Sequence, residues 1–536
     1  MASRLRIRIT AALAAGTAAA ALAGCGIPAL GGESEKAPVT AGAKAECGAV
    51  AAPGDGGRSR QLRAMWIATV AGIDWPKDTT DPAAEQRGQF TRLLDTATAM
   101  NMNAVFVQIR PNSDAFYDSP YEPWSQWITG TQGKDPGYDV LAFMIKEAHA
   151  RNLEFHAWFN PYRVSRQDDL NKLSPKSPAR QHPDWVRKYG TGLWYDPGLP
   201  QVRDLATRAV MDVVGKYDID AVHFDDYFYP YPEGGREFPD QATYKAHGGG
   251  MDRGDWRRRN VDTLVRDLSG KIHDAKPWVR FGISPFGVWR NKNTDPRGSD
   301  TRALQSYDDI YADTRTWIKK GWVDYITPQL YWPIGDPRAD YAELAGWWAA
   351  QVKGTGVHLT IGQGAYRVGK DAAWKNPAEL SRHLTLNAKY PQIRGDVYFS
   401  ASDIVSNRRG FAARLRADHY ARPAIPPIPA GRGGKAPPPV QDTAAAPAAG
   451  KGEKGVKVTW RASEGATSYA VYRVDGARPG CAPVDPQPLI ANVRGGGIID
   501  PAAKPGRTYT YYVTALDRLH HQSAPGRGAT VSPPQG

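Results

Sequence analysis

Two adjacent carboxylates, Asp225 and Asp226, follow a short apolar run and precede an aromatic segment at residues 227–230. Side chains alternate along a strand, so a strand ending here would point one carboxylate inward and the other toward its neighbours. Such a pair suits an oxocarbenium-like transition state, where one carboxyl group faces the reacting bond and the other orients a partner or a substrate amide. Asp225 and Asp226 are therefore the candidate catalytic residues; the alternative is that they cap a helix or form ion pairs.

A glycosidic bond also needs a carboxylic acid that protonates the leaving oxygen. Asp114, Glu122 and Glu233 lie in long connecting segments, and none of them stands out. Alternatively, one aspartate of the pair is the acid, the N-acetyl oxygen of the substrate is the nucleophile, and the other aspartate orients that amide. Both routes stay open from the residues alone.

Short apolar runs alternate with amphipathic segments on both sides of this pair. We expect strands at residues 63–70, 103–109, 154–159, 221–224, 279–284, 323–330, 357–361 and 396–399. We expect helices at residues 81–100, 138–151, 201–217, 254–273, 301–320, 340–352, 377–390 and 408–416. Strands that are each followed by a helix predict an α/β fold, a closed (β/α)8 TIM barrel over residues 61–420. Its surplus length falls in loops after the second, third and fourth strands.

Catalytic groups of this fold lie at the C-terminal ends of the strands. Polar and aromatic side chains stand there, which suits a polyhydroxylated ligand that hydrogen-bonds to amides and stacks on rings. Arg110 and Arg163 could hold a substrate carboxylate, and His223 is either a hydroxyl partner or a satisfied core residue. The candidate substrate-binding residues are Gln108, Arg110, Asp114, Trp158, Asn160, Tyr162, Arg163, His223, Tyr227, Tyr229, Gln329, Tyr331 and Trp332.

Composition narrows the function further. The 536 residues carry a formal net charge of +13, are 41% apolar and include 3 Cys, which excludes a chain disordered throughout and a disulfide-built scaffold. We find no spaced Cys/His cluster, Gly-rich phosphate loop or Gly-x-Ser-x-Gly elbow, so we expect no metal, no cofactor and no serine hydrolase chemistry. The positive net charge is not accompanied by a nucleic-acid-binding motif in the sequence. We expect no nucleic acid partner, but either attraction to anionic cell-surface polymers and lipid headgroups or a merely solubilising surface.

Residues 1–25 resemble a lipoprotein signal peptide, with a basic start, an apolar run at residues 9–23 and the lipobox-like sequence LAGC ending at Cys25. Acylation of Cys25 would make the chain an extracytoplasmic bacterial lipoprotein, anchored to the cell membrane without a transmembrane helix; ordinary secretory cleavage is the alternative. Residues 26–60 are expected to be a flexible tether. Cys47 and Cys481 would then either form a disulfide or remain two free thiols.

The C-terminal part has a different pattern. Residues 421–452 are rich in Pro, Ala and Gly and are expected to be a linker. Residues 453–536 are short alternating segments with Gly/Pro turns, which predict an all-β domain. The segments at 456–460, 469–473 and 505–515 resemble a fibronectin type III sandwich, in which Tyr509 would be the corner tyrosine that bonds back to the backbone. Its expected role is spacing or surface attachment.

Six motifs in chain order resemble the glycosyl hydrolase-like 10 family of bacterial barrels. They are RAMWIATV (63–70) with DWP (74–76), VQIRP (107–111), HAWFNPYR (156–163), HFDDYFYP (223–230), GISPFG (282–287) and TPQLYW (327–332). The resemblance implies glycoside hydrolysis, and some members cleave peptidoglycan glycan strands stripped of stem peptides. It leaves the acid unassigned. We therefore expect a hydrolase of the cell-wall glycan polymer; the alternatives are another secreted polysaccharide as substrate, or a sugar-binding envelope lipoprotein without catalysis.

Overall fold

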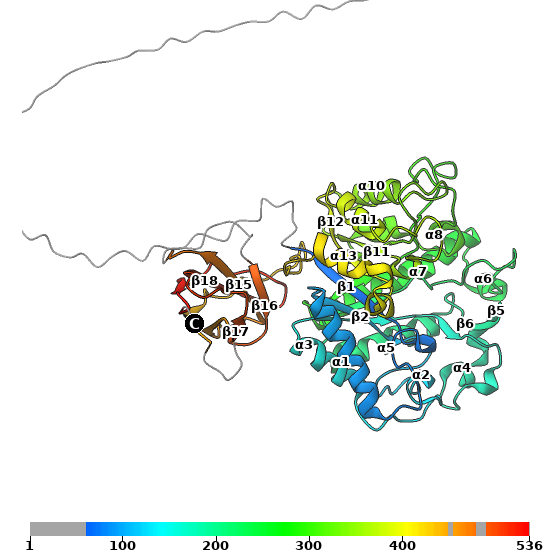
Figure 1. The fold of residues 1–536 in the computed structure, drawn as a ribbon. Helices are drawn as coiled ribbons and strands as arrows, with labels where there is room; N and C mark the ends of the chain where they lie inside the picture. The colour runs from blue at the N-terminus through cyan, green and yellow to red at the C-terminus, as the bar shows by residue number, and fades with distance from the viewer. Residues whose placement is uncertain (1–59, 449–453, 479–488, 535–536) are drawn as a thin grey trace, which may run out of the picture. The chain divides into compact units, whose positions relative to one another are not determined.

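A computed structural model describes residues 60–448, 454–478 and 489–534. Its central element is a closed barrel of parallel strands surrounded by helices (Figure 1), which confirms the expected (β/α)8 fold. The barrel strands are β1 (Leu62–Ile67), β2 (Ala104–Arg110), β3 (Glu154–Phe159), β7 (Ala221–Phe224), β8 (Arg280–Ile283), β9 (Tyr325–Ile326), β10 (Gln329–Leu330), β11 (His358–Gln363) and β12 (Ile393–Tyr398). The sixth strand is divided into β9 and β10, which both pair with β11. The interruption contains Pro328, which has no backbone N–H to donate.

Helices cover the outside of the barrel. They are α1 (Ala83–Ala99), α3 (Val140–Ala150), α5 (Pro200–Lys216), α7 (Arg253–Ala275), α10 (Tyr341–Val352), α11 (Glu379–Asn387), α12 (Ala401–Ser406) and α13 (Phe411–Asp418). The single helix expected at residues 301–320 is instead two, α8 (Ser306–Asp309) and α9 (Thr314–Lys320). The side chain of Asp313 accepts a hydrogen bond from the N–H of Thr316 and so begins a separate helix.

Alternation along the strands divides the apolar side chains between two cores. Ala64, Trp66, Phe106 and Tyr325 belong to the cluster inside the barrel. The intervening side chains of the same strands pack in the core that includes the helices, which explains why the strands are apolar on both faces. On β7 the inward series is Ala221 and then His223, so the next inward position beyond the strand is residue 225.

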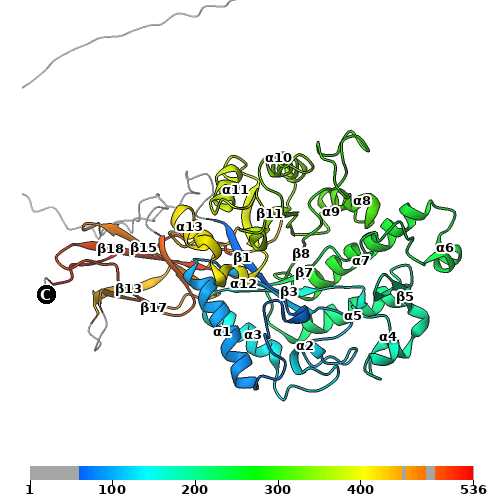
Figure 2. The same cartoon turned by 45° about the vertical axis from the view of Figure 1, so that its right-hand side comes forward.

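Long excursions follow β3 and β7 at the C-terminal end of the barrel. They carry a three-stranded antiparallel sheet of β4 (Arg163–Ser165), β6 (Gly192–Tyr195) and β5 (Val186–Tyr189), together with α4 (Pro178–Gln181) and α6 (Gln241–His247). Another short helix, α2 (Gln126–Thr129), follows β2. In Figures 1 and 2, α4, β5 and α6 lie together beyond the same end of the barrel strands. The surplus length of the chain therefore forms the rim where a barrel site is expected.

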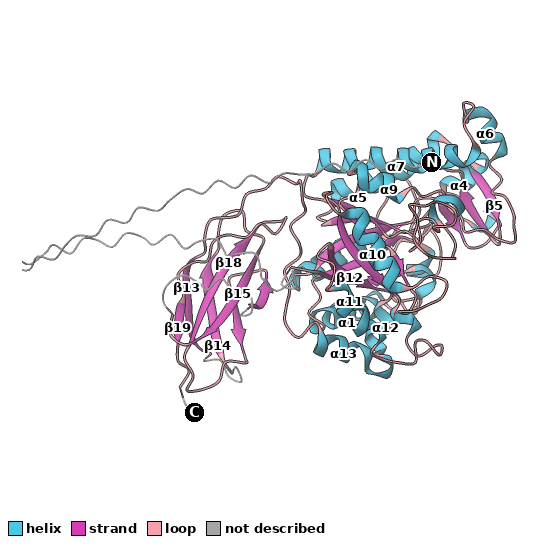
Figure 3. Ribbon diagram, turned by 90° about the horizontal axis from the view of Figure 1, so that it is seen from above, coloured by secondary structure: helices cyan, strands magenta, loops and turns pink. Residues whose placement is uncertain are grey.

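The C-terminal residues form two antiparallel sheets, coloured magenta in Figure 3. One has the order β13 (Gln441–Pro447), β14 (Val456–Arg461) and β17 (Gly497–Asp500); the other has β16 (Leu489–Val493), β15 (Ser468–Asp475), β18 (Tyr509–Leu516) and β19 (Ala529–Val531). The hydroxyl of Tyr509 accepts a hydrogen bond from the backbone N–H of Lys504 at 3.1 Å. A corner tyrosine is expected to make such a bond to the backbone a few residues upstream.

The signal peptide, the tether and all three cysteines, Cys25, Cys47 and Cys481, lie outside the described residues. Lipidation and the disulfide therefore stay predictions. Within the described ranges, no helix combines the length and the apolar character needed to cross a membrane.

A buried carboxyl group on β12 predicts how the stability of the barrel depends on pH. Asp396 accepts hydrogen bonds from the side-chain amides of Gln363 and Asn387, both at 2.8–2.9 Å, and burial raises its pKa to about 7. The folded state thus holds a proton on Asp396 that the unfolded chain releases near pH 4. Protonated Asp396 contributes its full stabilisation of the fold below pH 4, and this contribution is lost as the pH rises through about 7.

We expect Asp396→Asn, which keeps an oxygen acceptor, to remove this dependence. In denaturant titrations, the variant should gain stability relative to the parent protein between pH 5 and pH 8, by an amount on the order of 2–4 kcal/mol. Asp274→Asn, at an exposed position on α7, is the control. If the free energies of unfolding of Asp396→Asn and the parent differed by the same amount at pH 5 and pH 8, the raised pKa of Asp396 would be contradicted.

Candidate active site

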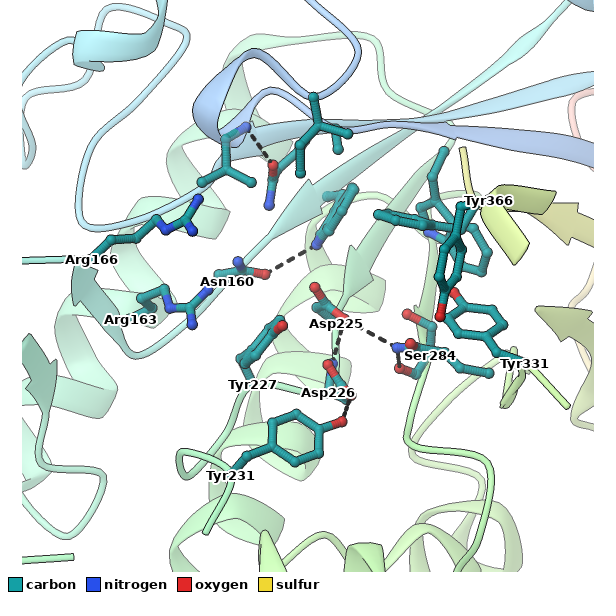
Figure 4. A pocket seen from close by; sticks show the side chains of 18 residues that line it. Asn160, Arg163, Arg166, Asp225, Asp226, Tyr227, Tyr231, Ser284, Tyr331 and Tyr366 are labelled. Carbon is teal, nitrogen blue, oxygen red and sulfur yellow. Dashed lines mark hydrogen bonds between the residues drawn. The ribbon is translucent and has the colours of Figure 1, made fainter. Parts of the chain in front are cut away.

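A cavity of about 440 Å³ opens at the C-terminal end of the barrel. Figure 4 shows Asp225 and Asp226 at its floor, Arg163 and Arg166 on one wall, and Tyr331 and Tyr366 on the opposite wall. The lining residues are Trp66, Ala68, Val70, Ile73, Gln108, Trp158, Asn160, Arg163, Arg166, Asp225, Asp226, Tyr227, Tyr231, Ser284, Gln329, Tyr331, Tyr366 and Phe399. Aromatic faces, amides and carboxyl groups thus surround one space.

The aspartate pair is fixed by hydrogen bonds. Asp225 Oδ1 accepts from the backbone N–H of Asp226 at 2.8 Å and from Gln329 Nε2 at 3.2 Å. The hydroxyl of Tyr231 donates to Asp226 Oδ2. Both aspartates are buried, with 8% and 4% of their surface exposed, although both reach the cavity. Each carboxyl group therefore has a defined orientation.

Burial raises the pKa of Asp225 well above its usual range, and the neighbouring charge of Asp226 raises it further. Burial also raises the pKa of Asp226, while hydrogen bonds from Asp225 and Tyr231 oppose that change. The positive charge of Arg163 lowers the pKa of both groups. Two carboxyl groups this close together resist double ionisation, so the pair can keep a proton on Asp225 while Asp226 is ionised.

A buried polar chain supports the cavity floor from inside the barrel. Gln329 Nε2 also donates to the carbonyl of Ser284 at 2.9 Å, and Ser284 Oγ lies 2.9 Å from His223 Nε2. His223 Nδ1 lies 3.2 Å from the hydroxyl of Tyr325, which lies 2.9 Å from His156 Nδ1. Burial holds the pKa of His223 well below its usual range, so the ring is neutral and able to accept hydrogen bonds.

Predicted site residues fall into two groups. The structure brings together, on the cavity wall, Gln108, Trp158, Asn160, Arg163, Asp225, Asp226, Tyr227, Gln329 and Tyr331. It places away from that wall Arg110, Asp114, Tyr162, His223, Tyr229 and Trp332. A direct role of the second group in binding stays a prediction.

The second group has other partners. Arg110 Nε donates to buried Glu122 at 2.7 Å, so this guanidinium is already neutralised and Glu122 is held as its partner. Asp114 is buried, which raises its pKa to about 6. Trp332 packs its ring edge to face against Phe286, with ring centroids 5.5 Å apart.

Several lining residues were not predicted, notably Trp66, Arg166, Tyr231, Ser284, Tyr366 and Phe399. Trp66, Ser284 and Phe399 stand at or just beyond strand ends, so the rule that the mouth of a barrel carries the site could have found them. Arg166 and Tyr231 lie in long loops, where the sequence has no strand or helix periodicity that would predict which side chains point into the cavity.

Within the described residues, no cluster of three or more His, Cys, Asp or Glu side chains could hold a metal ion. The carboxyl pair of the cavity can transfer protons, and it lies close to amide and aromatic groups suited to a sugar.

Comparisons with known proteins identify the family of the chain. Residues 61–378 match the family model described as "Glycosyl hydrolase-like 10". The chain is 47% identical to "Glycosyl hydrolase YngK" of Bacillus subtilis over 88% of this chain and 93% of that protein. It is 42% identical to "Glycosyl hydrolase DigH" of Escherichia coli over 64% of this chain and 83% of that protein.

Among solved structures, the glycoside hydrolase domain of PgaB (BpsB) from Bordetella bronchiseptica matches with 13% identity and a TM-score of 0.45, over 67% of this chain and 99% of that one. The family match and the identity to YngK carry the assignment: the chain belongs to the glycosyl hydrolase-like 10 family and is a glycoside hydrolase.

Proposed function

We propose that this glycoside hydrolase cleaves the glycan strands of peptidoglycan, at strands poor in peptides, with Asp225 as the proton donor. The observation that carries the catalytic part is the position of the pair. Asp225 and Asp226 are the only carboxylates on the cavity wall among the described residues, and they are adjacent. Mechanisms with two separate carboxylates need them on opposite sides of the scissile bond, roughly 5 Å or more apart.

One adjacent pair fits the substrate-assisted route better. The carbonyl oxygen of the substrate's 2-acetamido group attacks the anomeric carbon, while Asp225 gives its proton to the departing glycosidic oxygen. Asp226, held by Tyr231, accepts a hydrogen bond from the acetamido N–H and stabilises the cyclic cation. Asp225, now a carboxylate, takes a proton from the water that opens this ring. The acetamido group and Asp225 are restored, and the product keeps the original anomeric configuration.

Two further features support a cell-wall substrate. The formal net charge of +13 favours contact with anionic wall polymers. The lipobox-like sequence ending at Cys25 would keep the enzyme beside the wall, on the extracytoplasmic side of the membrane. The C-terminal sheets, with the Tyr509 bond, support a fibronectin type III domain that spaces the barrel from other surfaces.

Digestion of purified peptide-free glycan strands tests the substrate. We expect soluble fragments that retain the anomeric configuration of the cleaved bond, measured by NMR during the reaction. Asp225→Asn and Asp226→Asn should each lower the rate by about 10²–10⁴-fold, and Asp274→Asn on the surface should not. Inversion would exclude the acetamido route. Fragments from another polysaccharide and none from these strands would exclude the proposed substrate.

A good leaving group separates the roles of the two aspartates. A dinitrophenyl glycoside of a 2-acetamido sugar departs without protonation, so Asp225→Asn should recover most of the parent rate on it. Asp226→Asn should stay impaired, because orientation of the acetamido group is still required. The measurement is the ratio of kcat/KM on the aryl glycoside to kcat/KM on the glycan for each variant. The opposite pattern would exchange the two roles, and equal loss on both substrates would exclude the division of labour.

Membrane attachment gives an independent test of localisation. In bacterial cells the full-length protein should fractionate with membranes and enter detergent, whereas Cys25→Ala should no longer do so, because the acyl chains supply the anchor. Retention of the variant in the membrane fraction after the signal segment has been removed, as checked by mass spectrometry, would contradict a lipid anchor.

A further inference from the structure

The wall beside the aspartates carries two guanidinium groups, those of Arg163 and Arg166. Figure 4 shows both side chains reaching into the cavity, on the wall opposite Tyr331 and Tyr366. Within the described part of the chain neither has an ion-pair partner at 4.0 Å or less. Arg163 is half-buried and Arg166 is exposed, whereas the fully buried Arg110 is neutralised by Glu122.

The local structure brings these two side chains to the same space. Arg163 begins β4, and the register with β6 shifts between Arg163 and Ser165. Side chains three residues apart would point to opposite faces of a regular strand, whereas a bulge redirects those that follow it. Arg163 is further fixed by the rings of Tyr227 and Trp194, at 4.4 and 5.1 Å from its guanidinium carbon.

Nearby carboxylates are engaged elsewhere. Asp168 lies 3.7 Å from Lys188, and Asp169 accepts the backbone N–H of Asn171. Asp225 and Asp226 share the cavity with the arginines, but a pair that retains a proton carries less than two negative charges. The Arg163 side of the cavity therefore has an excess of positive charge.

We propose that Arg163 and Arg166 form a recognition site for a carboxylate on the sugar substrate, so that the enzyme selects acidic over neutral glycans. A guanidinium presents two parallel N–H groups that match the two oxygens of a carboxylate. The exposed position of Arg166 admits a substituent projecting from the sugar ring, while Arg163, packed on Tyr227, presents a fixed charge. This assignment rests on the proposed function of the cavity, since it concerns a substituent of that substrate.

A matched pair of substrates tests the proposal. One is a soluble oligomer of 2-acetamido sugars with free carboxylates on its side substituents, and the other is the same oligomer with each carboxylate converted to a primary amide. The parent enzyme should have a kcat/KM about 10–100-fold higher on the acid, chiefly through a lower KM. Arg166→Gln and Arg163→Gln should each reduce this preference at least severalfold, and Arg166→Lys should restore part of it.

Arg92→Gln, at an exposed position on α1, is the control and should keep the full preference. Equal kcat/KM for the acid and the amide in the parent enzyme, or an unchanged preference in both glutamine variants, would overturn the carboxylate site. Cleavage of neither oligomer would instead reject the proposed substrate. Circular dichroism of each variant separates a loss of fold from a loss of recognition, and the ratio between two substrates is insensitive to the amount of active enzyme.

Discussion

The site depends on burying two adjacent carboxyl groups at the end of β7. Taking a carboxylate out of water is costly, so each group must be compensated or must keep its proton. The protein does both. Asp225 accepts hydrogen bonds from the backbone N–H of Asp226 and from the side-chain amide of Gln329. Asp226 accepts a hydrogen bond from the hydroxyl of Tyr231. The positive charge of Arg163 lowers the pKa of both carboxyl groups. The result is a pair whose pKa values are both raised by burial, which suits a group that must donate a proton.

Support for this pair comes from the packing inside the barrel. Gly282 pairs with His223 on one side and with Tyr325 on the other, and a Cβ at Gly282 would lie 2.1 Å from the ring of Tyr325. Only glycine leaves room for this ring beside the strand. The ring in turn places a hydroxyl between His223 and His156, so the polar groups beneath the site are satisfied without water. The floor is therefore a packed layer, which holds Ser284 and Gln329 in place.

Strand periodicity was enough to predict the barrel, the position of the aspartate pair at its mouth and much of the cavity wall. The series Ala221, His223, Asp225 follows from alternation, and the same reasoning places Trp158 and Asn160 at the mouth. The distance of each inward position from the mouth could not be predicted, because it depends on the register between strands. His223 is one position too deep to reach the cavity. The ion pair of Arg110 with Glu122 could not be predicted either, because the fold of the loop after β2 brings Glu122 to Arg110.

The longer loops contribute positive charge to the site. Arg163 lies at the start of the excursion after β3 and acts on both aspartates through space. A carboxylate bound to Arg163 would cancel part of its field, and the pKa values of the pair would then rise, which favours the protonated acid. Binding of an acidic substrate and readiness to protonate its leaving group would in this way depend on the same guanidinium. With a neutral sugar bound, the charge of Arg163 would still lower the pKa values of both aspartates and disfavour the protonated acid. Preference for an acidic substrate would therefore extend from binding to the proton-transfer step.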